Sequence, residues 1–150
     1  MRTIERDIVS AVIIGKNGRL LLAHKSDKGV YPGTWGIFGG GIDEGEDKRT
    51  ALNREVLEES GIDISKYPAI LVQEAKGESE KTLKETGERV FVKMNFFTYK
   101  VVLYDVDTDS IKVTIDREHI EYKWFEVREL KNIKLPPPSV ELFKKLGFIK

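Results

Sequence analysis

Three glutamates near the middle of the chain have the residue type and spacing of a metal-binding group. Glu55, Glu58 and Glu59 occupy positions i, i+3 and i+4, which lie on one face of an α-helix. Like charges at this spacing destabilise an isolated helix by roughly 0.2–0.5 kcal/mol per pair. Carboxylate oxygens are preferred ligands of Mg²⁺ and Mn²⁺. The spacing therefore indicates a bound divalent cation, and the alternative is a solvated acidic helix face.

The helix that must carry these glutamates is predicted over residues 48–60. Asp47 is the predicted N-cap, and Gly61 stands where a helix usually stops. The glutamates lie toward the C-terminal end, where the helix macrodipole disfavours anions, so local propensity does not account for them. Four apolar residues recur at helical spacing and predict one apolar stripe. They are Ala51, Leu52, Val56 and Leu57.

A glycine-rich turn precedes this helix. Gly39 and Gly40 are interpreted as positions where the backbone approaches a ligand closely, because glycine has no side chain in the way. The other glycines of the turn are interpreted as ordinary turn residues. Glu46 and Arg54 are expected to pair, which would tie the turn to the helix.

Nine positions of this region fit the signature G-x5-E-x7-R-E-U-x-E-E-x-G-U, in which U is an aliphatic residue. They are Gly40, Glu46, Arg54, Glu55, Val56, Glu58, Glu59, Gly61 and Ile62. From average residue usage, the seven fixed residues fall in register by chance on the order of 10⁻⁸ times per start position. This signature is the Nudix box, and the chain resembles the Nudix hydrolases.

The resemblance implies an α/β (α+β) fold, an α/β/α sandwich around a mixed β-sheet, with residues 1–150 as one domain. It also implies Mg²⁺-dependent hydrolysis of a nucleoside diphosphate linked to another group. The box glutamates look like the metal ligands, and the carbonyl of Gly39 looks like a backbone ligand beside them. The positions that shape the loop–helix–loop are matched by Gly40, Glu46, Arg54 and Gly61.

Residues 28–35 and the three glycines that follow look most like one bacterial subgroup, the nucleoside triphosphatases that favour pyrimidine deoxynucleotides. The expected products are a monophosphate and pyrophosphate. The box is shared with hydrolases of oxidised purine triphosphates, ADP-ribose and nucleotide sugars, so these substrates stay open. A nucleotide-binding module without turnover is a further alternative. Phe38 departs from the family, in which many members carry proline before the paired glycines.

Four residues outside the box are candidate site residues. Lys25 stands where the family often places a basic residue that meets phosphate oxygens. Tyr31 is a candidate for stacking on a base, and Asn95 for a polar contact to it. Glu118 lies six residues before Trp124, as an acid does in many relatives. It is expected to complete the metal site or to act as the general base, a role for which Glu55 is the other candidate, and Glu121 is its rival at a shorter spacing.

The remaining chain predicts mostly strands. They are expected at 8–14, 19–25, 69–75, 89–103 and 122–125, with an exposed charged hairpin tip at 76–88. A final helix is expected to begin with Ser139 as its N-cap.

Composition narrows the class of protein. The chain has 150 residues, 25 basic and 25 acidic side chains and no cysteine. A duplex nucleic-acid partner is not predicted because there is no basic excess. The sequence predicts neither a signal peptide nor a membrane-spanning segment. A cytoplasmic location is expected. The expected partner is a small nucleotide, and the resemblance adds a homodimer.

Overall fold

The computed structural model describes residues 1–26, 31–116 and 119–150. In these ranges seven strands form one sheet with the path β3-β2-β1-β6-β5, while β4 pairs with β1 and β7 pairs with β2. The strands are β1 (Arg2–Gly15), β2 (Leu20–Lys25), β3 (Trp35–Gly36), β4 (Phe38–Gly41), β5 (Ala69–Thr82), β6 (Arg89–Leu103) and β7 (His119–Phe125). The helices are α1 (Lys48–Ser60) and α2 (Pro137–Lys145), with short 3₁₀ helices η1 (Thr108–Ser110) and η2 (Val127–Asn132).

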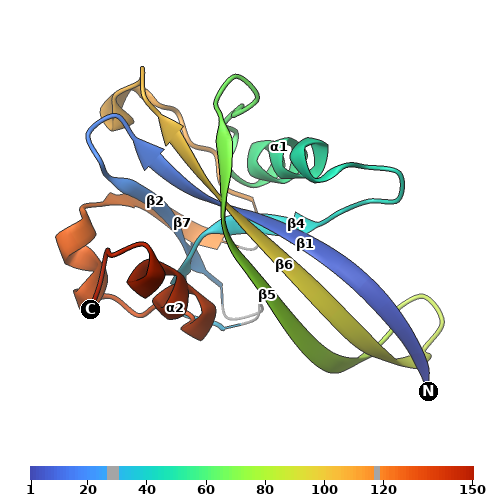
Figure 1. Cartoon of the computed structure of the whole chain (residues 1–150). Helices are drawn as coiled ribbons and strands as arrows, with labels where there is room; N and C mark the ends of the chain where they lie inside the picture. Colours follow the sequence, from blue (N-terminus) through green and yellow to red (C-terminus); the bar gives the residue numbers. More distant parts are fainter. Residues whose placement is uncertain (27–30, 117–118) are drawn as a thin grey trace.

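β1 is the central strand, and its side chains alternate between two apolar cores. It runs parallel to β6 and antiparallel to β2 and β4, which makes the sheet mixed. Val9, Ala11 and Ile13 belong to the core under α1, whereas Val12 belongs to the core under α2. The two helices thus cover opposite faces of the sheet, which confirms the predicted α/β/α sandwich (Figure 1).

α1 has the predicted bounds and caps. The Asp47 side chain accepts a hydrogen bond from the Thr50 N–H, and Gly61 adopts a left-handed conformation with φ of 76°. The predicted apolar stripe is wrong at one position. Ala51, Leu52 and Val56 are buried, but Leu57 is 51% exposed because it lies on the side of the helix that faces away from these core residues.

The predicted hairpin tip at 76–88 is mostly strand. Residues 76–82 continue β5 and pair with 89–95 of β6, so only 83–88 form the connection. Together with the first half of β1, these segments form a three-stranded ribbon, called the arm, that extends from the body (Figure 1). Charged side chains of the arm form ion pairs between neighbouring strands, as Arg89 and Glu80 do at 2.8 Å.

The final helix begins three residues earlier than predicted. Its N-cap is Pro136, and Ser139 is buried within the first turn without capping the helix. Proline is accepted in a first turn because its φ is already helical and its missing N–H would have no intrahelical partner.

Candidate active site

Arg54 pairs with Glu46, as predicted, and so joins the glycine turn to α1. Its Nε and Nη2 donate to the two carboxylate oxygens of Glu46 at 2.7 and 2.9 Å, and Nη2 also donates to the Gly41 carbonyl at 3.0 Å. The hydrogen bonds from Arg54, with one from the Asp43 N–H, lower the pKa of Glu46 to about 2. Glu46 therefore stays ionised and the turn is fixed to the helix.

The same guanidinium reduces the repulsion among the box glutamates. Arg54 Nη1 lies 2.9 Å from Glu55 Oε1 and 3.4 Å from Glu58 Oε2. This contact was not part of the sequence interpretation, in which a cation alone offset the glutamate charges. The arginine supplies part of that compensation within the protein itself.

Glu55 is held against the backbone of Gly40. Its carboxylate group occupies the place that a β-carbon on Gly40 would take. The Glu55 side chain is only 14% exposed. Burial raises the pKa of Glu55, although the neighbouring Arg54 opposes the rise. A partly desolvated carboxylate of this kind is a suitable ligand for a hard cation.

Glu59 is fixed to the neighbouring glycine. The Gly39 N–H donates to Glu59 Oε1 at 2.8 Å, and Glu59 is buried. Gly39 itself is packed so closely on Val9 and Ser10 of β1 that a β-carbon would overlap their backbone. Glu58, by contrast, is 59% exposed beside Arg54.

These carboxylates fit a divalent ion of the Mg²⁺ type. Oxygen ligands in that number, two of them partly withdrawn from water, are the donor set that such an ion takes. The carboxylates of Glu55 and Glu59 lie against two consecutive glycines of β4, Gly40 and Gly39.

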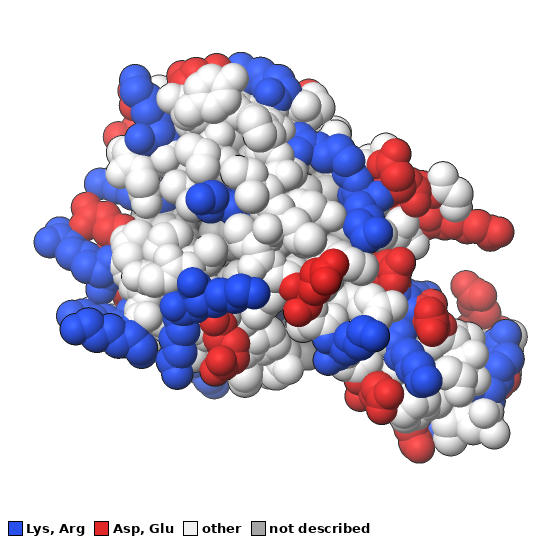
Figure 2. Space-filling model, in the orientation of Figure 1, with Lys and Arg blue, Asp and Glu red and all other residues white. Residues whose placement is uncertain are grey.

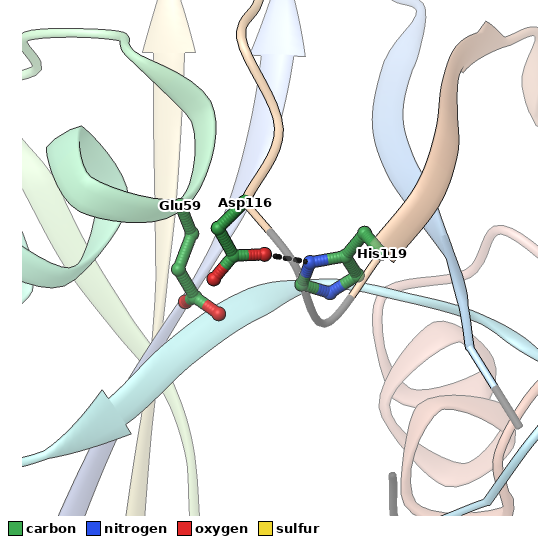
Figure 3. Close-up of side chains that lie close together, drawn as sticks. All are labelled: Glu59, Asp116 and His119. Carbon is green, nitrogen blue, oxygen red and sulfur yellow. Dashed lines mark hydrogen bonds and ion pairs between the residues drawn. The ribbon is translucent and has the colours of Figure 1, made fainter. Parts of the chain in front are cut away.

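Two residues that the sequence interpretation missed lie beside Glu59. Asp116 approaches it from the segment before β7, and His119 approaches it as the first residue of β7 (Figure 3). One possible ligand atom from each of Glu59, Asp116 and His119 lies within 4.8 Å of the others. The sequence shows only an aspartate three residues before a histidine, and this spacing alone does not indicate that either residue approaches Glu59.

The remaining candidates are spread more widely. Lys25 pairs with His119 across β2 and β7, so it borders the Glu59 group. Tyr31 is exposed and has φ of 56°, a conformation that is unusual for a bulky residue. Asn95 donates to Asp7 Oδ1 at 3.0 Å on the arm. Glu118 lies outside the described residues.

A polar depression of about 510 Å³ separates the glycine turn from the arm. It is lined by Glu5, Arg6, Asp7, Gly41, Ile42, Asp43 and Glu44. Figure 2 shows this notch, with acidic and basic side chains interspersed over the visible face. Asn95 lines a second, smaller depression that shares Glu5 with the first.

In the described part of the chain, no helix is long and apolar enough to cross a bilayer.

The box geometry and the sandwich fold together define a Nudix enzyme. Residues 5–146 match the NUDIX domain family, so the chain belongs to that family and is a Nudix pyrophosphohydrolase. It is 31% identical over 134 residues to nucleoside triphosphatase NudI of Klebsiella pneumoniae subsp. pneumoniae, an alignment that covers 87% of this chain and 88% of the relative.

Solved structures support the fold. The MutT protein from Methanosarcina mazei Go1 superposes with a TM-score of 0.68 at 23% identity, over 98% of this chain and 96% of that one. The Escherichia coli dihydroneopterin triphosphate pyrophosphohydrolase superposes with a TM-score of 0.67 at 20% identity, over 92% of each chain. At these identities the likeness concerns the fold.

Proposed function

We propose that this enzyme hydrolyses a nucleoside triphosphate, preferably a deoxynucleotide, to a monophosphate and pyrophosphate with Mg²⁺. The observation that supports it most is the pair of carboxylates held on consecutive glycines, the partly buried Glu55 on Gly40 and the buried Glu59 on Gly39. The similarity to nucleoside triphosphatase NudI supports the triphosphate as substrate.

The proposed metal ligands are Glu55, Glu58, Glu59 and the Gly39 carbonyl. A bound divalent ion would neutralise charge on the phosphate oxygens and lower the pKa of a coordinated water. Of the protein groups, Glu55 is proposed to take the proton of the attacking water, with Glu118 as the alternative base. The new bond joins the water oxygen to the α-phosphorus, and the bond from that phosphorus to the bridging oxygen breaks.

The proposed substrate contacts have separate roles. Lys25, beside the Glu59 group in the β2–β7 ladder, is proposed to meet phosphate oxygens. Tyr31, exposed at a strained backbone position, is proposed to stack on the base. Asn95 is proposed to make a polar contact to it from the arm.

The test is a product assay with Mg²⁺ over a panel of substrates. The panel contains deoxy- and ribonucleoside triphosphates, an oxidised dGTP, ADP-ribose and GDP-mannose, with products separated by chromatography. Monophosphate and pyrophosphate from the deoxynucleotides would support the proposal. Turnover of a conjugate alone would retain the Nudix chemistry and change the substrate. Binding without any product over hours would favour a nucleotide-binding module.

A further inference from the structure

The Asp116 carboxylate lies between Glu59 and the His119 ring. Figure 3 shows the three side chains arriving from α1, from the segment before β7 and from β7 itself. Their possible ligand atoms lie within 4.8 Å of one another. The nucleotide chemistry described above assigns no role to Asp116 or His119.

His119 has the environment of a residue that holds another in place. Its Nδ1 lies 2.7 Å from Asp116 Oδ1, and its side chain is only 1% exposed. The ring also makes an edge contact with Phe38, the residue that replaces the family's proline, with centroids 5.5 Å apart. The orientation of the imidazole, and with it that of the Asp116 carboxylate, is therefore fixed from two sides.

The position of Asp116 favours a cation between it and Glu59. Two carboxylates this close repel one another when both are ionised, and the buried position of Glu59 strengthens that repulsion. A divalent ion removes the conflict and takes oxygen ligands from both residues. Carboxylates that bind metals are commonly oriented by a second hydrogen-bonding residue, as Asp116 is by His119.

We infer that Asp116 is a further ligand of the divalent ion held by Glu59, and that His119 is a positioning residue for Asp116. The inference rests on the proposed function for the presence of that ion. It assigns the acid that completes the site to Asp116, eight residues before Trp124, in place of Glu118.

The first experiment measures Mn²⁺ binding without nucleotide, by counting free Mn²⁺ with electron paramagnetic resonance. Asp116→Asn is expected to weaken the affinity by about 10- to 100-fold. His119→Phe keeps a ring against Phe38 but loses the hydrogen bond, so it is expected to weaken binding in the same direction. His119→Asn keeps a donor near the position of Nδ1 and is expected to recover part of the affinity. Asp109→Asn, the same change at an exposed aspartate in η1, is the matched control and is expected to bind as wild type.

Two further measurements, Mn²⁺ binding by Glu118→Gln and thermal unfolding of Asp116→Asn, test whether Glu118 is the ligand instead and whether Asp116 has only a structural role. Wild-type Mn²⁺ affinity in Asp116→Asn, with a loss only in Glu118→Gln, would overturn the assignment. A lower melting temperature of Asp116→Asn with unchanged Mn²⁺ affinity would also overturn it, because Asp116 would then only stabilise the turn into β7.

A measurement on the wild-type protein avoids any variant that fails to fold. The chain has two histidines, so the imidazole proton signals of His24 serve as an internal reference for those of His119. Substoichiometric Mn²⁺ is expected to broaden the His119 signals before those of His24. Equal broadening, or broadening of His24 first, would refute the site. If the wild type hydrolyses no nucleotide, the proposed function fails while these metal titrations still test the role of Asp116.

Discussion

The carboxylate of Glu55 stands in the space that a side chain on Gly40 would occupy. The neighbouring residue differs, because a side chain on Gly39 would overlap the backbone of β1. Two adjacent glycines of the same strand thus serve different purposes, since Gly40 makes room for a site carboxylate and Gly39 allows the strands to pair.

Alanine at these two positions should separate activity from stability. Gly40→Ala displaces the end of the Glu55 side chain, so we expect a folded protein whose kcat/KM falls on the order of 100-fold, as a misplacement of about 1 Å can cause. Gly39→Ala forces the β1–β4 pair apart, so we expect a large loss of melting temperature. Circular dichroism and steady-state kinetics on both variants check this. Similar melting temperatures for the two variants would contradict it.

Glu55→Gln should raise the stability of the metal-free enzyme at neutral pH. The raised pKa of Glu55 means that ionising it destabilises the folded state. Its contribution to stability is present below the pKa of the unfolded chain and is lost as pH rises through the raised folded value. Glutamine does not ionise, so the variant does not lose this stability as pH rises. Above the folded pKa of Glu55, the melting temperature of the variant should therefore exceed that of wild type.

The same substitution should lower kcat by about 10²- to 10⁴-fold if Glu55 is the base. Scanning calorimetry in EDTA and product assays with Mg²⁺ measure the two effects. An unchanged rate would remove Glu55 from the assigned site.

Arg54→Gln should weaken the dependence of stability on pH in the acid range. The pKa of Glu46 is lowered from 4.5 to about 2 by Arg54, so its contribution to stability is present above 4.5 and is lost as pH falls toward 2. Without the guanidinium this pH dependence should shrink. Melting temperatures of wild type, Arg54→Gln and Glu46→Gln from pH 2 to 6 provide the comparison. Identical slopes in all three proteins would show that the pair does not control acid stability.

Leu52→Ala and Leu57→Ala should differ sharply, although both leucines lie on α1. Leu52 is fully buried, so its truncation should cost about 2–5 kcal/mol of unfolding free energy. Leu57 is half exposed, and its truncation should stay within about 0.5 kcal/mol. Urea denaturation of the two variants measures the difference. Equal losses would place Leu57 in the core.

The elements that local sequence determines were predicted closely. The limits of α1 follow from its cap residues, and the Glu46–Arg54 pair follows from the box spacing. The length of the arm was underpredicted because residues 76–82 of β5 are polar, charged or glycine and almost all exposed, so they show no alternation of apolar residues. Its length depends on pairing with distant strands, which hydrophobic periodicity does not report.

At the site, the sequence did not predict that Asp116 and His119 lie beside Glu59. Their separation of three residues is visible in the sequence, but their approach to Glu59 depends on how β7 pairs with β2. A tertiary contact of this kind has no local pattern. Phe38 was noted only as a departure from the family, and its contact with His119 became evident from the fold.

The parallel pairing of β1 with β6 also sets the order in which this enzyme can assemble. Partners in this ladder are 88 residues apart, as in Ser10 and Thr98, and the pairing includes all 14 residues of β1. During synthesis the whole Nudix box, residues 40–62, is made before β6, which begins at residue 89. The loop-closure entropy of such distant pairing must be overcome before its contacts form, so this step should limit the folding rate. A nascent chain that ends after α1 contains every box glutamate and still lacks the strand that completes its central sheet.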